Sequence, residues 1–147
     1  MAYDEVLAER AREALAAEPD VTERKMFGGL GFMLGGNMAV AASGLNGQSF
    51  AFVGYLPTDA TTRAQRLREL ETHSRRWQQT QLLIETPYRN AAMAQALLAS
   101  LHPETWLSIS CGLTLQGGST RTQRVSRWRV APPMLPSDVP AVFAFLA

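Results

Sequence analysis

Side chains that could do chemistry are concentrated in the segment Thr80–Asn90, which reads TQLLIETPYRN. Leu82–Ile84 is a short apolar run of the kind found in strands buried on both faces, and Glu85 ends it with a charge. Thr86 can cap a helix, and the proline after it suits the first helical position because its missing N–H is not needed there. Apolar residues at helical spacing then continue over Ala91–Leu101. The sequence therefore predicts a strand, a sharp turn and a helix.

The carboxyl end of this predicted strand carries four functional side chains: Glu85, Thr86, Tyr88 and Arg89. In open α/β sheets, ligands bind in the crevice outside the carboxyl ends of the strands, so these positions are candidates for a binding site. The alternative is a purely structural turn in which Glu85 and Arg89 form a local ion pair at the start of a capped helix. The sequence alone leaves both interpretations open.

The composition is that of an ordinary globular chain. With 147 residues, 46% of them apolar, we expect one domain, or one domain and a small appendage, around a real core. No apolar run approaches the roughly 20 residues of a membrane span, so we expect no membrane contact. The acidic start, Met1–Glu5, opens an amphipathic helix and does not resemble a secretory signal.

Cysteine and histidine content excludes two further classes of site. Cys111 is the only cysteine, which rules out an internal disulfide and fits a reducing cytoplasm. Together with two distant histidines, His73 and His102, it cannot form a zinc site. We therefore expect a cytoplasmic protein with no metal, in which Cys111 packs in an apolar strand and is not a nucleophile.

Charge is distributed unevenly along the chain. Residues 1–44 hold seven acids and four bases, a net of −3, whereas the rest holds ten arginines and six acids, a net of +4. Basic character made only of arginine suits phosphate contact. If the protein contacts nucleic acid, we expect the contact at Arg121 and Arg124, which lie near Trp128 in the most arginine-rich segment.

The periodicity of apolar residues predicts the remaining elements. A helix is expected over Asp4–Ala17, followed by a β-hairpin whose strands, Met26–Leu34 and Met38–Ala42, flank Gly35–Asn37. We interpret the glycines of residues 28–31 as hairpin glycines, since no helix follows them as a phosphate-binding loop would require. The other expected elements are strands at Ser49–Leu56, Trp106–Leu113 and Val139–Leu146 and a helix from Ala60 to just before Ser74, capped by Thr58–Asp59.

The first part of the chain resembles one known family. Residues 21–33, VTERKMFGGLGFM, and residues 36–40, GNMAV, are similar to the start of the TfoX N-terminal domain family, named for a bacterial competence regulator. A further strand carrying an arginine and a Phe-x-x-x-Gly-Arg-Pro-Met segment, which that family has next, are not present, so the resemblance covers residues 1–44. It implies a helix, a hairpin and a regulatory or adaptor role through protein contacts.

The rest of the chain, residues 45–147, resembles a second family. The motifs are Ser43–Pro57, Ile84–Arg89, Leu107–Thr114 and Val139–Leu146. They are similar, in order, to the C-terminal half of the tetrapyrrole methylase family, and most of all to its ribosomal-RNA ribose methyltransferase branch. This resemblance implies an α/β fold with a mixed sheet flanked by helices, preceded here by the N-terminal helix and hairpin.

The two resemblances disagree at their junction, residues 39–44. That segment would be a hairpin strand in the first family, whereas in the second it would close a helix with Gly44 as its C-cap. From the residues we expect a meander: the hairpin strand, a turn at Gly44–Gly47 and the strand that begins at Ser49.

The second resemblance also implies a cofactor. Tetrapyrrole methylases hold S-adenosylmethionine between two domains, and most of the pocket belongs to an N-terminal domain that this chain lacks. The side chains facing cofactor and acceptor would form half of a site: Thr86, Tyr88, Arg89, Gly112, Leu113 and Thr114. We assign no catalytic residue, because methyl transfer depends mainly on holding donor and acceptor in line.

Three functional hypotheses follow. The first is a fragmentary or chimeric relative of an S-adenosylmethionine-dependent RNA methyltransferase, inactive alone, with the missing pocket supplied by another chain, such as a second copy. The second is a TfoX-like adaptor, and the third is a stable product of recombination or design without an evolved function. A hydrolase is disfavoured because neither histidine has neighbours that would orient it as a base.

Overall fold

The structure, a computed structural model, describes residues 6, 9–10, 12–13, 21–26, 29–34, 38–113 and 115–147. The chain divides into two compact units, Met1–Met38 and Ala39–Ala147. In the first unit, the described residues between 6 and 13 are helical. Strand β1 (Val21–Met26) then pairs antiparallel with β2 (Gly29–Leu34), with Val21 opposite Leu34. The described residues thus agree with the predicted N-terminal helix and show an antiparallel strand pair, whereas the rest of that helix and the predicted turn at Gly35–Asn37 lie outside the described residues.

The predicted bounds of the hairpin are wrong. Its strands are Val21–Met26 and Gly29–Leu34, and the expected second strand, Met38–Ala42, lies in helix α2 (Met38–Ser43). Three of the six residues of α2 are alanines, the residue with the highest helix propensity, and this preference outweighs the apolar character that suggested a strand. Gly44 follows with φ +69°, the left-handed conformation that ends helices. The expected meander is therefore replaced by a helix that leads into the next strand.

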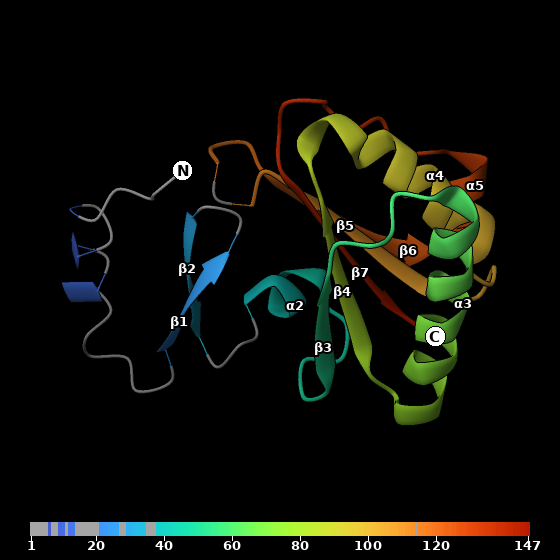
Figure 1. The fold of residues 1–147 in the computed structure, drawn as a ribbon, viewed down its shortest axis with the longest axis horizontal. Coiled ribbons are helices and arrows are strands. Elements are labelled where there is room, and N and C mark those ends of the chain that lie inside the picture. The colour runs from blue at the N-terminus through green and yellow to red at the C-terminus, as the bar shows by residue number, and fades with distance from the viewer. Residues whose placement is uncertain are drawn as a thin grey trace. The chain divides into compact units, whose positions relative to one another are not determined.

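The second unit is built on a five-stranded mixed sheet with the order β3-β4-β7-β5-β6 (Figure 1). Strand β3 runs parallel to β4, and the other neighbouring pairs are antiparallel. The strands are β3 (Phe50–Gly54), β4 (Thr80–Glu85), β5 (Trp106–Cys111), β6 (Ser119–Arg124) and β7 (Ala141–Leu146). The helices are α3 (Ala60–Trp77), η1 (Pro87–Arg89), α4 (Asn90–Ser100) and α5 (Val125–Val130). The predicted α/β fold, with a mixed sheet flanked by helices, is confirmed.

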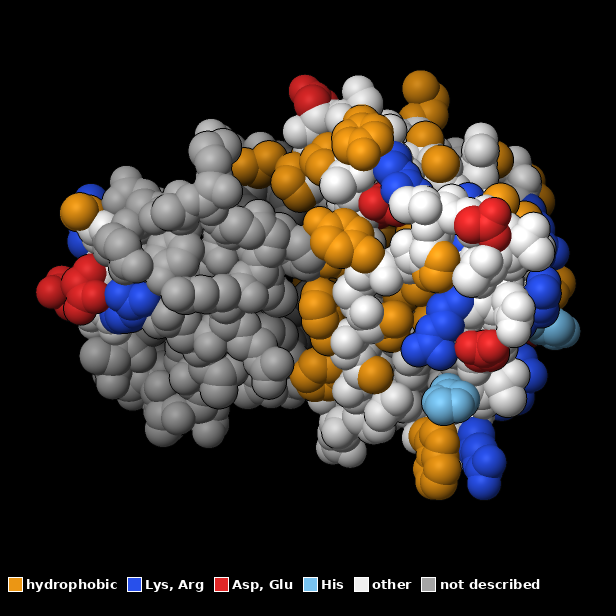
Figure 2. All heavy atoms as spheres, in the orientation of Figure 1, with side chains coloured by type: hydrophobic (Ala, Val, Ile, Leu, Met, Phe, Trp, Pro, Cys, Tyr) orange, Lys and Arg blue, Asp and Glu red, His pale blue; other side chains and the backbone are white. Residues whose placement is uncertain are grey.

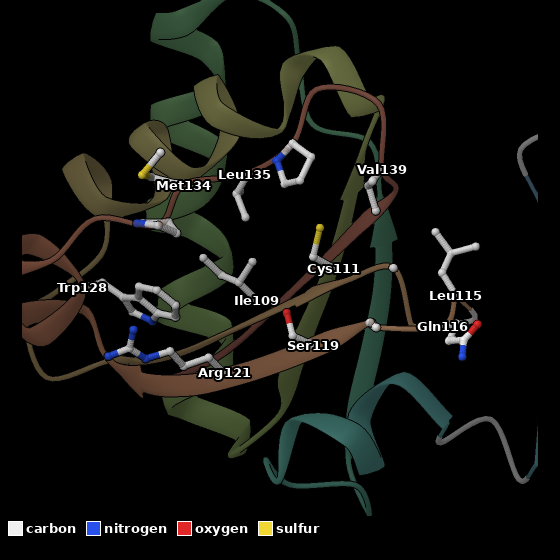
Figure 3. Close-up of a pocket in the computed structure, with 15 residues that line it drawn as sticks. Ile109, Cys111, Leu115, Gln116, Ser119, Arg121, Trp128, Met134, Leu135 and Val139 are labelled. Carbon is white, nitrogen blue, oxygen red and sulfur yellow. The ribbon is translucent and has the colours of Figure 1, made fainter.

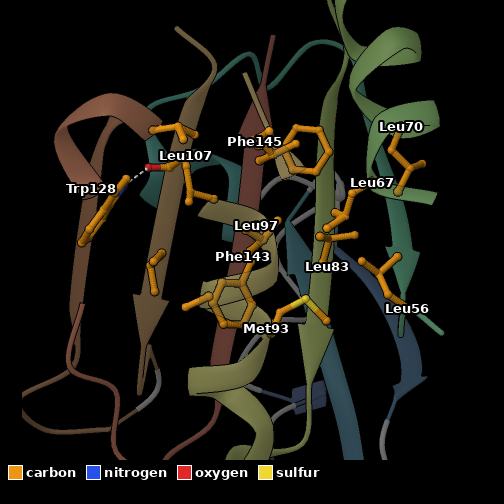
Figure 4. Packing of buried hydrophobic residues seen from close by; sticks show 14 of the residues in the cluster. Leu56, Leu67, Leu70, Leu83, Met93, Leu97, Leu107, Trp128, Phe143 and Phe145 are labelled. Atoms are coloured by element: carbon orange, nitrogen blue, oxygen red, sulfur yellow. Dashed lines mark hydrogen bonds between the residues drawn. The ribbon is translucent and has the colours of Figure 1, made fainter. Parts of the chain in front are cut away.

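Alternation along the central strands creates two cores, one on each face of the sheet. The larger contains Leu83, Phe143 and Phe145, packed against the helices α3, α4 and α5 (Figure 4). The smaller contains Leu82 and Ala144, packed against α2. All six residues of β4 are buried, which confirms the prediction of a strand covered on both faces. None of the helices in the described ranges is long and apolar enough to cross a bilayer.

Helix α3 begins where the sequence predicts and ends later. The Asp59 carboxylate accepts hydrogen bonds from the Thr62 N–H (2.8 Å) and hydroxyl (2.7 Å), as expected of an N-cap. The helix continues past Ser74 to Trp77 and ends at Gln78, whose φ of 49° is left-handed. The Ser74 side chain faces inward and accepts from the Ala147 N–H at 3.0 Å, which explains how a polar residue lies within the helix.

Strand β6 and helix α5 are not predicted from the sequence. The sequence of β6, STRTQR, shows no apolar alternation, because the side chains that it presents to β5 include hydroxyl groups. The hydroxyl groups of Thr120 and Thr122 are hydrogen-bonded to serine hydroxyls of β5, Ser110 and Ser108, at 2.9 Å. In α5, the indole N–H of Trp128 donates to the Leu107 carbonyl at 2.9 Å, which fixes the helix on the sheet.

The packing predicts that the large core carries the stability of residues 39–147. The Phe143 side chain is fully buried in the central strand, so Phe143→Ala should lower the free energy of unfolding by about 3–5 kcal/mol, measured by urea denaturation. Val130 is 85% exposed at the end of α5, so Val130→Ala should change the free energy of unfolding by less than about 0.5 kcal/mol. Equal effects of the two substitutions would contradict this description of the core.

Candidate functional site

The carboxyl ends of β4 and β5 lie at the same edge of the sheet. Strand β7 runs between them and begins at Ala141, which is opposite Glu85 on one side and Cys111 on the other. Two strand spacings separate the ends of β4 and β5, roughly 10 Å. The structure therefore brings the predicted residues after β4 and those after β5 to one edge, which we call the strand-end edge.

The turn after β4 uses most of its polar groups internally. One oxygen of the buried Glu85 carboxylate accepts from the N–H of Thr86 (2.8 Å) and from its hydroxyl (3.2 Å). The other oxygen lies 3.5 Å from the guanidinium of Arg89. Thr86 therefore does not cap the helix with its side chain, and the alternative of a structural Glu85–Arg89 ion pair describes this geometry correctly. Tyr88 is the predicted residue that remains outside, with 73% of it exposed.

Asn90, the first residue of α4, is a member of the strand-end edge that the sequence did not identify. Its side-chain amide donates to the Val139 carbonyl at 2.8 Å. Its Oδ1 is buried and has no hydrogen-bond partner among the described residues. Buried acceptors are rarely left unpaired, and each one requires an explanation. The sequence offered one signal for Asn90. It is an amide side chain at the first position of a helix made mostly of alanine and leucine.

Gly112 closes the strand-end edge from the β5 side. Its N–H donates to the Pro140 carbonyl at 2.8 Å, and its φ of +62° is left-handed. A Cβ at this position would lie 3.2 Å from Cγ1 of Val139, so both conformation and space favour glycine. Leu113 follows and is 39% exposed, whereas Thr114 lies outside the described residues.

A hollow of about 450 Å³ adjoins this edge (Figure 3). Its walls are mostly apolar and come from β5, the β5–β6 turn, α5 and the segment before β7: Ile109, Cys111, Leu115, Trp128, Leu135 and Val139. Arg121 contributes the one cationic side chain, and its guanidinium lies 5.2 Å from the centre of the Trp128 ring. A hollow of this size and lining is typical of small-molecule sites.

The two arginines predicted to contact nucleic acid do not lie together. Arg121 lines the hollow, whereas Arg124 is at the opposite end of β6. The Arg124 guanidinium donates to both the carbonyl and the carboxylate of Glu104 at 2.8 Å and lies over the Trp106 ring. Nucleic-acid contact at these residues stays a prediction.

Cys111 is a poor nucleophile in this setting. Burial raises the pKa of its thiol, and the negative charge of Asp138 raises it further. The thiolate, which is the reactive form, is therefore scarce at neutral pH. No cluster of three potential metal-binding side chains occurs in the described parts of the chain.

No protein-family model and no curated protein matches the sequence. The resemblances of residues 1–44 to TfoX and of the rest to the RNA methyltransferase branch therefore stay predictions. Among solved structures, the chain is similar to uroporphyrin-III-C-methyltransferase from Thermus thermophilus, at 20% identity over 80% of this chain and 50% of that one (TM-score 0.46).

Two further solved structures show the same level of similarity. The methyltransferase CobJ is 17% identical over 95% of this chain and 58% of its own length, with a TM-score of 0.48. The Thermus thermophilus enzyme complexed with S-adenyl homocysteine is 16% identical over 74% and 48%, with a TM-score of 0.45. The chain thus spans about half the length of these methyltransferases.

The environment of Cys111 predicts slow alkylation with a displaced pH dependence. Because the folded thiol has a raised pKa, the rate of reaction with iodoacetamide should reach its midpoint at a higher pH than in the urea-unfolded chain. Asp138→Asn removes the exposed negative charge and should shift the midpoint of the folded protein back toward lower pH. A folded midpoint at or below the unfolded one would show that Cys111 is activated.

Proposed function

We propose that residues 39–147 form one half of an S-adenosylmethionine-dependent methyltransferase, inactive alone and completed by another chain. The observation that carries the proposal is the strand-end edge itself. The turn after β4, the buried amide of Asn90 and the backbone of Gly112 meet there, beside a hollow of about 450 Å³.

The residues of this edge fit one side of the cofactor. Asn90 Oδ1 is a buried acceptor without a partner in the described structure, and we propose that it accepts from an adenosyl or methionyl N–H or O–H group when the edge opens to admit the cofactor. Val139, whose carbonyl accepts from the Asn90 amide, also lines the apolar hollow, whereas Asn90 itself is fully buried and is not one of the lining residues. When bound, the cofactor would supply an electrophilic methyl group on its sulfonium; the chain would bind and orient it and exclude water.

The exposed apolar residues of the same edge support completion by a partner. Tyr88, Leu113 and Leu115 are 73%, 39% and 53% exposed, and they follow the ends of β4 and β5. A group of large apolar side chains exposed around a binding edge is typical of a surface that another protein covers. We propose a second copy of this chain as the partner.

We further propose RNA as the methyl acceptor. Two features support this choice: the resemblance of Ile84–Arg89 to the motif of the ribosomal-RNA branch and the ten arginines, without lysine, after residue 44. The Glu85–Arg89 pair is closed, so we assign it a positioning role in the turn and not direct contact with phosphate.

Isothermal titration calorimetry tests cofactor binding. The wild-type chain should bind S-adenosylmethionine with a dissociation constant below about 1 mM, a binding free energy of about −4 kcal/mol or better. Asn90→Leu should weaken binding about fivefold by removing the acceptor. Asn46 has a comparable amide bond, to the Gln78 carbonyl at 2.6 Å, and Asn46→Leu should leave affinity unchanged because it lies away from the strand-end edge. Absence of heat at millimolar ligand would rule out the proposal.

A further inference from the structure

A second hollow, of about 530 Å³, lies at the opposite edge of the sheet, where β5 begins and β7 ends. Six-residue strands separate it from the strand-end edge by roughly 20 Å. Its side chains come from the end of α3, the loop before β5 and the end of β6: Arg75, Gln78, His102, Glu104, Trp106 and Arg124. We call this region the arginine–tryptophan edge.

Two exposed tryptophans at this edge each have an arginine guanidinium over the ring. The Arg124 guanidinium lies 4.9 Å from the centre of the Trp106 ring, and that of Arg76 lies 5.1 Å from the centre of the Trp77 ring. Trp106 is 41% exposed and Trp77 is 62% exposed, whereas Trp128 is buried in the core. A guanidinium close to the face of an indole adds a cationic group to an aromatic surface on which a nucleobase can stack.

The Trp106 platform is held in place before any ligand binds. Two hydrogen bonds of 2.8 Å to Glu104 fix the guanidinium of Arg124. The buried carboxylate of Glu71, in α3, accepts from the His102 N–H at 2.7 Å and from the Thr105 hydroxyl. The loop that leads into Trp106 is thereby attached to α3. Such preorganisation lowers the conformational entropy that the side chains lose when a ligand binds.

Positive charge lies next to both platforms. Arg75 and Arg76 are in the last turn of α3, and Arg75 lines the hollow together with Arg124. Among the described side chains of this edge, Glu104 is the one acidic group that lines the hollow, and its charge is paired with Arg124. In Figure 2, a basic and a hydrophobic side chain project together below the lower end of α3. Arginines beside exposed aromatic rings are the combination that single-stranded nucleic acids require.

We propose that the arginine–tryptophan edge binds single-stranded nucleic acid. Bases stack on Trp77 and on the Trp106–Arg124 pair, while phosphates contact Arg75 and Arg76. Because this edge is remote from the strand-end edge, it anchors a strand and does not present the atom to be modified. Binding therefore does not depend on the proposed cofactor site and is expected without S-adenosylmethionine.

Fluorescence anisotropy of the full chain with labelled oligo-uridine RNA and oligo-thymidine DNA tests this proposal. At least one strand should bind with a dissociation constant between about 1 and 100 µM at physiological salt, weakening as salt rises. Equal affinities for the two strands would show that the protein recognises the bases and phosphates common to RNA and DNA. Tighter binding of the RNA would identify RNA as the preferred ligand. No binding of either strand up to about 100 µM would overturn the proposal, whatever the result for S-adenosylmethionine.

Substitutions locate the surface. Trp77→Ala should weaken binding roughly 5- to 100-fold by removing one stacking platform. Arg76→Gln should reduce the slope of log affinity against log salt by about 0.7, the value for one phosphate contact with a single strand. Arg68→Gln is the matched control, an exposed arginine earlier on the same helix, and should leave affinity and slope unchanged. An equal loss in the control would show diffuse electrostatics and refute the assigned site.

A conservative variant separates stacking from folding. Trp106→Phe keeps an aromatic ring beneath Arg124, so binding should persist within about threefold, while the part of the tryptophan fluorescence quenched by the oligonucleotide decreases. Unchanged quenching in both Trp106→Phe and Trp77→Phe would mean that the strand binds elsewhere.

Discussion

The geometry of the strand-end edge depends on two hydrogen bonds to one short segment of backbone. The Val139 carbonyl accepts from the side chain of Asn90, and the Pro140 carbonyl accepts from the N–H of Gly112. These bonds hold the start of α4 and the end of β5 on the segment that leads into β7. Because β7 pairs with both β4 and β5, the same segment fixes the distance between the two strand ends. Any ligand at this edge meets a surface whose spacing is already set.

The charges at this edge are used to build the turn. Glu85 is buried, and its carboxylate accepts from Thr86 and pairs with Arg89, so removing Arg89 would leave an uncompensated charge. Among the described residues of this neighbourhood, the buried polar atom without a partner is Asn90 Oδ1. Among the described residues of this edge, the charges of Glu85 and Arg89 are paired and the raised pKa of Cys111 keeps its thiol protonated, so the proposed site would orient a ligand and not exchange protons with it. That limitation agrees with methyl transfer, which requires alignment more than proton transfer.

Sequence patterns predicted the elements in which apolar residue types mark the buried positions. The run Leu82–Ile84 identified β4, and the alanine-rich periodicity after it identified α4. Strand β6 was not predicted, because its side-chain contacts with β5 are pairs of hydroxyl groups. The alanine-rich segment Met38–Ser43 was predicted as a strand and is a helix. Asn90 was not identified, because its side chain bonds to Val139, which is 49 positions away. The periodicity of apolar residues carries no information about such long-range pairs.

Nuclear magnetic resonance of the labelled protein, titrated with S-adenosylhomocysteine, tests the central claim most directly, because this demethylated form of the cofactor has no methyl group to transfer. The claim predicts that the largest shifts occur at the side-chain amide of Asn90 and the backbone N–H groups of Gly112 and Leu113. Signals of Trp77 and Trp106, at the other edge, should stay unchanged. Shifts centred on those tryptophans, or none near Asn90, would contradict a cofactor half-site at the strand-end edge.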